Sequence, residues 1–274
     1  NQFDKALTGY QYIIGKSRGI YTETSLAKAS YLYYKDKKYQ EALPLFQQLQ
    51  EIAETPSNKS AGKFGAMRCA FYLNQFETAL EECNKVLSTE KLSPQQTSEA
   101  KYIKAKSLYE TRRYDDALVE FKAMTKAAKN VTGAEAYYYI SKIEFNKKEY
   151  KEVEKTVTKL IGYEYSNDDW NNKGMLLLGD AYLELGNEAD AEVILQTLIE
   201  NKPAPEYVEE ANKRLEALKT RQKQAEAARL EAQNKAMNIE FKESKNDGDL
   251  FDKMMEDFEK QKTAPTNTII EQPK

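Results

Sequence analysis

One spacing recurs six times along this chain and limits its fold more than any other feature. A large residue, usually aromatic, is followed three positions later by a small one and four positions after that by a second large residue, as in Tyr114, Ala117 and Phe121. The small position falls at residues 6, 42, 79, 117, 153 and 191, so consecutive copies lie 36, 37, 38, 36 and 38 residues apart. A fixed period of this size predicts a solenoid of stacked helical units.

Each unit is expected to hold two antiparallel helices, which approach closely only where small side chains face each other. The sequence supplies such residues at matched offsets in three units, with looser versions at Met67/Ala79 and Ser141/Val153. Since one unit cannot bury its apolar face alone, stability must be collective. The three clear pairs are Ser30/Ala42, Ala105/Ala117 and Gly179/Ala191.

The last unit carries the fullest motif: Met175, Leu178, Gly179 and Tyr182, followed by Ala191 and Leu195. With this motif the chain resembles a tetratricopeptide-repeat (TPR) protein over residues 1 to 201, although Trp is replaced at the first motif position and each unit is slightly longer than usual. The resemblance implies an all-α fold, a right-handed superhelix of TPR-type helix-turn-helix units.

We expect the TPR solenoid to fill 1–201, with an orphan second helix at 1–18 that suggests a piece of a longer repeat protein. A capping helix should follow at 203–220, then a charged helical extension and an amphipathic segment at 221–262, with a break at Asn246-Asp247-Gly248. The end, 263–274, should be disordered. The five helix pairs are expected at about 22–56, 60–94, 97–130, 133–165 and 170–201.

Composition argues against several functions. The chain has no histidine and no recognisable catalytic or phosphate-binding motif, so we expect no enzyme, no metal site and no cofactor. A net charge of −3 gives no bulk attraction to nucleic acid, and no apolar run is long enough to span a membrane. The two cysteines, Cys69 and Cys83, are read as core residues on facing helices; a disulfide between them is the alternative.

A candidate binding groove follows from the resemblance, which implies that the second, fifth, ninth and twelfth positions of each first helix face a ligand. In three consecutive units a basic ninth residue lies between aromatic fifth and twelfth residues, which suits a peptide with acidic and apolar side chains. The alternative is that the aromatics pack between helices and the cations are ordinary surface charges. The groove residues are Tyr31, Tyr34, Phe64, Arg68, Phe71, Tyr102, Lys106, Tyr109, Tyr138, Lys142 and Phe145.

The acidic segment near the C-terminus carries a second candidate surface, an apolar stripe at helical spacing. It has the form of a docking helix for a partner's groove, and the groove of its own chain or of a neighbouring copy could receive it, which would give self-association. The alternative is a helix that closes off the C-terminus. The stripe consists of Leu250, Phe251, Met254, Met255 and Phe258.

These features favour a non-catalytic scaffold or adaptor that binds a protein or peptide in its concave groove. A glycan or cell-wall binding module is the alternative, because tyrosines along a groove also stack on sugar rings. Salt should separate the two, since it screens charged contacts but not stacking on a neutral sugar. The composition also resembles that of long TPR proteins of the Bacteroidota cell envelope, which implies a periplasmic or outer-membrane-associated location.

Overall fold

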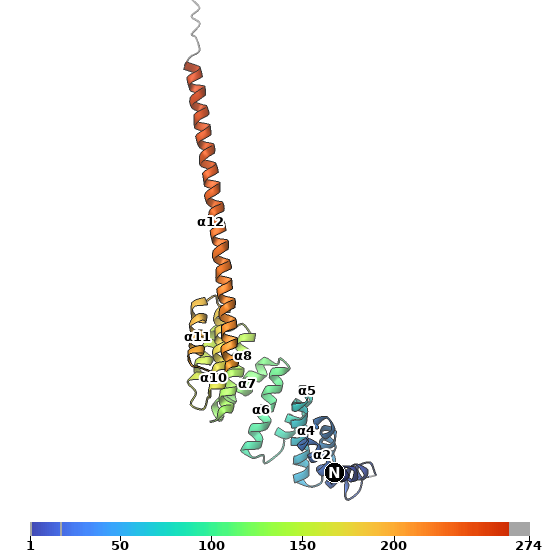
Figure 1. The fold of residues 1–274 in the computed structure, drawn as a ribbon. Helices are drawn as coiled ribbons and strands as arrows, with labels where there is room; N and C mark the ends of the chain where they lie inside the picture. Colours follow the sequence, from blue (N-terminus) through green and yellow to red (C-terminus); the bar gives the residue numbers. More distant parts are fainter. Residues whose placement is uncertain (1, 17, 263–274) are drawn as a thin grey trace, which may run out of the picture. The chain divides into compact units, whose positions relative to one another are not determined.

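The computed structural model describes residues 2–16 and 18–262, except for the side chains of 2, 3, 238–247, 258 and 260–262. Every regular element in these ranges is a helix, which confirms the all-α prediction (Figure 1). The chain divides into two compact parts, Asn1–Ala211 and Asn212–Lys274, each considered by itself below. The first part contains the helices α1 (Gln2–Ile14), α2 (Thr22–Lys35), α3 (Tyr39–Ile52), α4 (Pro56–Tyr72), α5 (Phe76–Leu87), α6 (Pro94–Glu110), α7 (Tyr114–Ala127), α8 (Val131–Asn146), α9 (Tyr150–Ile161), α10 (Asp168–Glu184) and α11 (Glu188–Glu200).

From α2 to α11 the helices form five consecutive pairs. Each helix packs against the next one along the chain, and the first helices of neighbouring pairs also meet, α2 with α4, α4 with α6 and α8 with α10. Each pair buries too little apolar surface to be stable alone, so the array is held together from unit to unit. The helical-repeat prediction is therefore confirmed.

Small residues lie where the paired helices cross. Ala42, Ala79 and Ala117 are completely buried. A Cβ on Gly179 of α10 would lie 3.0 Å from the Cδ2 atom of Leu195 on the paired helix α11, so a larger residue there would crowd that helix. The matched small residues of the sequence thus set the distance between the helices.

The turn inside each pair has three residues, and its middle residue is left-handed. The φ angles are 58° at Lys37, 57° at Asn74, 59° at Arg112, 61° at Lys148 and 76° at Gly186. This conformation lets the turn close hydrogen bonds onto the end of the first helix; the amide of residue 148, for example, donates to the Phe145 carbonyl at 2.9 Å. The five turns therefore have one geometry, although only one of them has glycine at its centre.

The two cysteines are free and completely buried, so the core interpretation is confirmed and the disulfide alternative is wrong. Both belong to the apolar core shared by the first pairs. Burial away from water raises the pKa of each thiol to about 12, because the thiolate would be poorly solvated there.

One helix, α12 (Pro205–Lys262), runs for 58 residues through the predicted capping helix, the extension and the amphipathic segment. The predicted break at Asn246-Asp247-Gly248 is therefore wrong. A single glycine costs a helix only about 1 kcal/mol relative to alanine, and the good helix formers on both sides, such as Lys245 and Leu250, offset that cost. Ala211, Leu215 and Leu218 form a buried stripe near the start of α12, while their role as a cap stays a prediction.

None of the helices in the described ranges combines the length and hydrophobicity that crossing a bilayer requires. The predicted disordered tail, 263–274, lies outside the described residues.

Candidate functional site

The aromatic residues at the twelfth position lie at the ends of the first helices, just before the turns. Each one packs against the residue that begins the second helix of its own pair, with ring centroids 5.3 to 6.2 Å apart. They help to fix the angle between the paired helices, which is the packing role that the alternative to the groove gave them. The four contacts are Tyr34–Tyr39, Phe71–Phe76, Tyr109–Tyr114 and Phe145–Tyr150.

The aromatic residues at the fifth position contribute to the contacts between units instead. Phe64 is only 6% exposed and belongs to the core, so it offers a ligand almost no surface. The hydroxyl of Tyr102 donates to Glu135 Oε1 at 3.0 Å, and the ring of Tyr138 lies 5.4 Å from that of Trp170. Burial and the neighbouring Glu135 carboxylate raise the pKa of Tyr102, which therefore stays a hydrogen-bond donor at neutral pH.

Two of the three predicted cations are paired with carboxylates of the next unit. Arg68 on α4 forms a bidentate bridge to Glu99 on α6, with Nε–Oε1 and Nη2–Oε2 distances of 2.5 and 2.7 Å. The Nζ atom of Lys106 on α6 lies 3.1 Å from Oε1 of Glu135 on α8, and both side chains are mostly buried. These bridges join successive first helices.

Glu99 and Glu135 are the residues that the sequence analysis missed. They occupy the second position, which the TPR resemblance marks as ligand-facing, one unit after the cations that they bind. The available signal was the recurrence of opposite charges 31 residues apart for Arg68 and Glu99 and 29 residues apart for Lys106 and Glu135.

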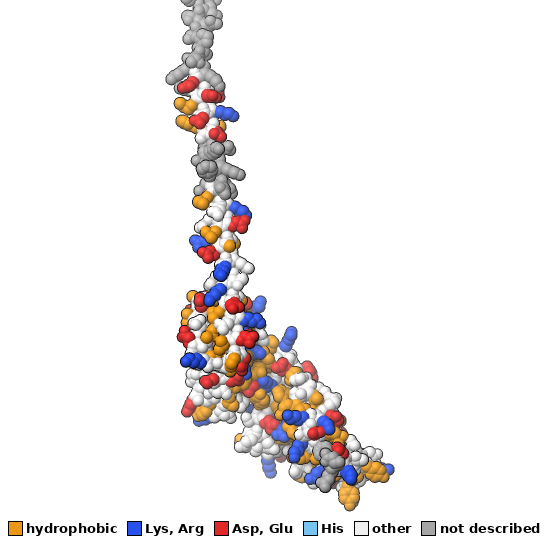
Figure 2. Space-filling model, in the orientation of Figure 1, with side chains coloured by type: hydrophobic (Ala, Val, Ile, Leu, Met, Phe, Trp, Pro, Cys, Tyr) orange, Lys and Arg blue, Asp and Glu red, His pale blue; other side chains and the backbone are white. Residues whose placement is uncertain are grey.

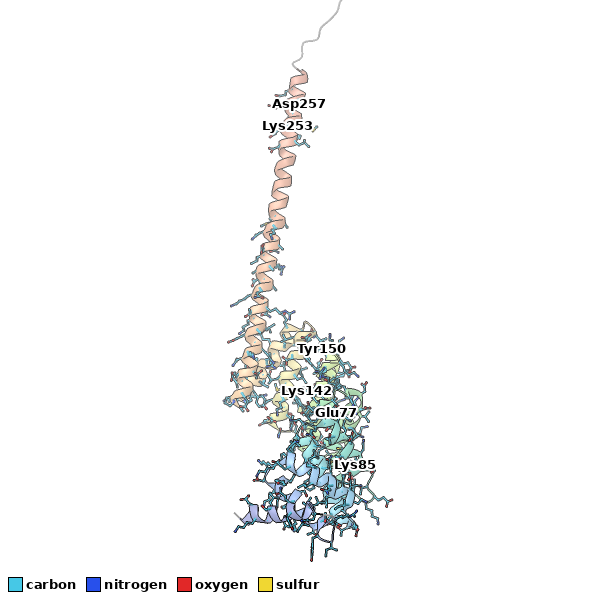
Figure 3. The ribbon with its side chains drawn as sticks, turned by 90° about the vertical axis from the view of Figure 1, so that its right-hand side faces the viewer. Glu77, Lys85, Lys142, Tyr150, Lys253 and Asp257 are labelled. Atoms are coloured by element: carbon cyan, nitrogen blue, oxygen red, sulfur yellow. The ribbon has the colours of Figure 1, made fainter. Side chains whose placement is uncertain are left out.

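Lys142 on α8, labelled in Figure 3, differs from the other two cations. No ion pair joins it to a carboxylate in the described part of the chain; its amine lies 5.3 Å from the ring centre of Tyr109 and 5.7 and 5.8 Å from those of Tyr138 and Tyr139. Desolvation lowers the pKa of Lys142, but interactions with the three tyrosines more than offset this, and the pKa lies above its ordinary value. Lys142 is thus a charged amine in an aromatic setting.

A cleft of about 480 Å³ opens between α6 and α8 beside these groups. Both bridging carboxylates line it together with Tyr102, and hydroxyl and amide groups complete the lining. It can receive a chain segment that presents hydrogen-bond donors. Its lining residues are Gln95, Ser98, Glu99, Tyr102, Thr132 and Glu135.

The first pairs present a separate group of tyrosines. Tyr31 on α2 is 56% exposed and Tyr72 on α4 is 51% exposed. The ring of Tyr72 stacks on that of Tyr39, with centroids 4.8 Å apart, and lies 6.4 Å from that of Tyr34. Of the predicted groove residues, Tyr31 therefore offers the most open aromatic surface.

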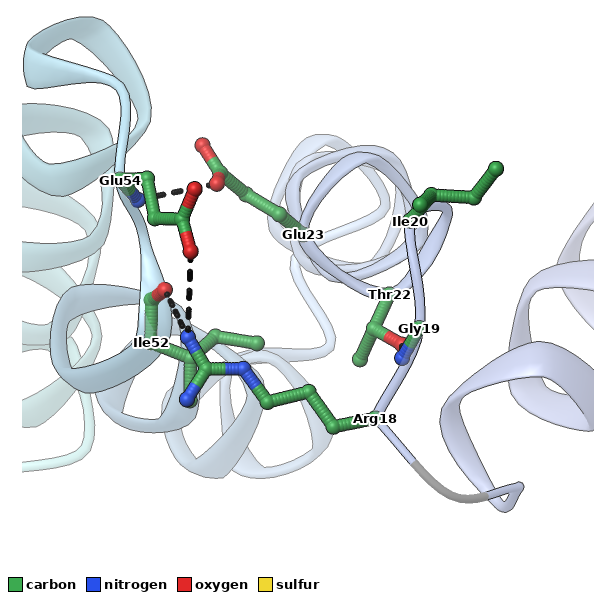
Figure 4. Close-up of a pocket in the computed structure, with 7 residues that line it drawn as sticks. All are labelled: Arg18, Gly19, Ile20, Thr22, Glu23, Ile52 and Glu54. Carbon is green, nitrogen blue, oxygen red and sulfur yellow. Dashed lines mark hydrogen bonds and ion pairs between the residues drawn. The ribbon is translucent and has the colours of Figure 1, made fainter.

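Another cleft, of about 450 Å³, lies beside the start of α2 and the end of α3 (Figure 4). Its polar groups already bind one another: Arg18 Nη2 donates to the Ile52 carbonyl at 3.1 Å, and Glu23 accepts from the Glu54 amide at 2.9 Å. These bonds hold adjoining segments together, so the cleft has a structural role.

The predicted docking residues of α12 have open side chains. Leu250, Phe251 and Met254 are 62%, 63% and 66% exposed, and Met255 is 49% exposed. The side chain of Phe258 lies outside the described residues. In the described ranges no group of three or more Cys, Asp or Glu residues could hold a metal ion.

Solved structures share this helical array. The crystal structure of YrrB, a TPR protein with an unusual peptide-binding site, has a TM-score of 0.52 and 16% identity, and the match covers 78% of this chain and 98% of that one. This chain has the tetratricopeptide-repeat fold. The TPR prediction made from the sequence is therefore confirmed for the fold.

Other structures are similar to this TPR array. BtubC from P. vanneervenii has a TM-score of 0.51 and 9% identity over 73% of this chain and 87% of that chain. A TPR protein from Parabacteroides merdae has a TM-score of 0.42 and 15% identity over 78% of this chain and 77% of its own. No family model and no curated protein matches the sequence.

Proposed function

We propose that this chain is a non-catalytic protein-interaction scaffold that holds a peptide segment of its partner against the first helices α4, α6 and α8. The observation that carries the proposal is the charged strip on three consecutive units: the Arg68–Glu99 bridge, the Lys106–Glu135 bridge and Lys142, beside the cleft between α6 and α8. Both signs of charge alternate along this strip, so it can fix the direction and the register of a peptide.

The paired charges would act as hydrogen-bonding groups of fixed position. Each bridge holds its carboxylate in place, so Glu99 and Glu135 could accept bonds from peptide amides at little further cost in side-chain entropy. Lys142 would supply the attraction for an acidic side chain, because it has no carboxylate of its own among the described residues. The preferred ligand is therefore a peptide with an acidic residue next to an apolar or aromatic one.

The test uses Lys142→Glu, because this substitution reverses the charge of the strip without breaking either bridge. A random-peptide display library would be selected against the wild-type chain, and the selected peptides measured by calorimetry with the variant. We expect enrichment of acidic, apolar peptides and a loss of affinity of about tenfold or more with Lys142→Glu.

The matched control is Lys151→Glu on α9, an exposed lysine outside the strip, which should leave the affinity unchanged. An equal loss of affinity with both variants would mean that the change in net charge alone explains the effect. Equal affinity of all three proteins would contradict the proposed site.

A second function is favoured by the exposed Tyr31 and the stacked Tyr39–Tyr72 pair, which could bind sugar rings. Such a glycan or cell-wall module would be consistent with the cell-envelope location that the Bacteroidota resemblance implies. Binding to a neutral glycan should persist between about 0.05 and 0.5 M salt, whereas binding of the acidic peptides should weaken.

A further inference from the structure

Beyond Leu218, helix α12 presents apolar side chains that are exposed. Every side chain that the structure describes between Lys219 and Asp257 is exposed. Among them are Leu230, Met237, Phe251 and Met255, at 53%, 62%, 63% and 49%. A long helix in water gains most of its stability from packing against another surface, so a partner that covers these side chains would stabilise α12.

Four of the exposed apolar residues lie on one seam of the helix, whereas Leu250 and Met254 lie outside it. Positions 230, 237 and 251 differ by multiples of seven, and Met255 follows Phe251 by four, as the a and d positions of a heptad repeat do. Asn234 falls on the same seam, where a polar residue restricts register and the number of strands. A seam of this period fits another helix along its length better than it fits a compact groove.

The two ends of the exposed helix carry opposite charge (Figure 2). Residues 219–235 contain five basic and two acidic residues, a net charge of +3. Residues 249–259 contain five acidic residues and one basic residue, a net charge of −4. Two copies side by side in the same direction would place like charges together, whereas opposite directions pair the basic end of each with the acidic end of the other.

We propose that α12 pairs with α12 of a second copy as an antiparallel coiled coil. In the register that aligns the charged ends, Leu230 meets Met255 of the other copy, and Met237 meets the small residue at position 248. This interaction uses none of the residues of the strip on α4, α6 and α8, so it goes beyond the proposed function. It makes the protein a dimer with two copies of the peptide site.

The association is tested by sedimentation equilibrium of the full chain at low and high salt. We expect a dimer that weakens as salt increases. Leu230→Glu should weaken it at least tenfold, because it places a charge on the seam. Ala232→Glu adds the same charge two residues away on the opposite face and should leave the dimer intact. A monomeric wild-type chain, or equal effects of the two substitutions, would overturn the proposal.

The direction is tested with a short bismaleimide and two single-cysteine additions, Leu230→Cys and Met255→Cys. Cys69 and Cys83 are completely buried and have a pKa of about 12, so they should react slowly. In the antiparallel pair, positions 230 of the two copies lie roughly 37 Å apart along the axis. Cross-linked dimers should therefore form only when the two variants are mixed. Cross-linking of each variant with itself would indicate parallel helices and overturn the antiparallel arrangement.

Discussion

Glu23 shows how one residue joins two helical pairs. Its carboxylate accepts hydrogen bonds from the hydroxyl of Thr55 at 2.5 Å, from the side chain of Asn58 at 2.8 Å and from the Glu54 amide at 2.9 Å. Thr55 precedes α4 and does not cap it with its own side chain, so Glu23 satisfies donors at the start of that helix from the preceding pair. These donors, Thr55 first, lower the pKa of Glu23 from 4.5 to about 2.

This shift predicts a specific pH dependence. Because the folded pKa lies below the ordinary one, ionised Glu23 stabilises the fold fully above about pH 4.5, and that contribution is lost as the pH falls towards 2. We expect Glu23→Gln to lower the free energy of unfolding near neutral pH and the difference from wild type to shrink between about pH 5 and pH 2. Urea unfolding of both proteins at a series of pH values measures this difference in the free energy of unfolding. A difference that does not change with pH would contradict the role given to the ionised carboxylate.

At the scale of the elements, the turns matter as much as the helices. All five pairs reverse through a left-handed residue, and lysine, asparagine or arginine occupies that position in four of them. A left-handed conformation costs a residue with a Cβ about 1–2 kcal/mol, which the closure of the helix ends offsets. The central residues of the turns are therefore sites of stored strain.

Substitutions at two of these turns should have opposite effects. Lys148→Gly removes the strain but increases the entropy of the unfolded chain, so we expect a net gain of about 0.5–1 kcal/mol. Gly186→Ala meets no atom within 4 Å, so its only penalty is the φ of 76°, and a loss of about 1 kcal/mol should follow. Calorimetric melting of both variants measures these changes in stability. A Gly186→Ala variant more stable than wild type would contradict the claim that the left-handed turn residue is strained.

The sequence predicted these elements well because period and small residues are local signals. The five helix pairs follow the period of the small position at residues 42, 79, 117, 153 and 191, and Cys69 and Cys83 are core residues as expected. The continuity of α12 was missed because turn residues were given more weight than the helix formers around them. The glutamate partners of the cations were missed because each bridge joins residues about one unit apart, and helical periodicity within one segment cannot reveal it.

At the scale of the whole molecule, residues of the proposed site also hold neighbouring helical pairs of the first part together. Arg68, Lys106 and Tyr102 belong to the proposed site, yet each contacts the next helical pair. Reversing Arg68 or Lys106 would therefore disturb folding along with binding, whereas a substitution of Lys142 breaks neither bridge. Sequence reasoning indicated the face of the helices but could not separate these two roles, because both need charged and aromatic side chains.

The most direct test of the proposed site is hydrogen–deuterium exchange of the full chain with and without a peptide selected on it. We predict slower exchange in α4, α6 and α8, strongest around Lys106 and Lys142, and no change in the second helices α7 and α9. Slower exchange confined to α7 and α9, or to α12, would contradict the account, because the peptide would then bind a different face of the protein.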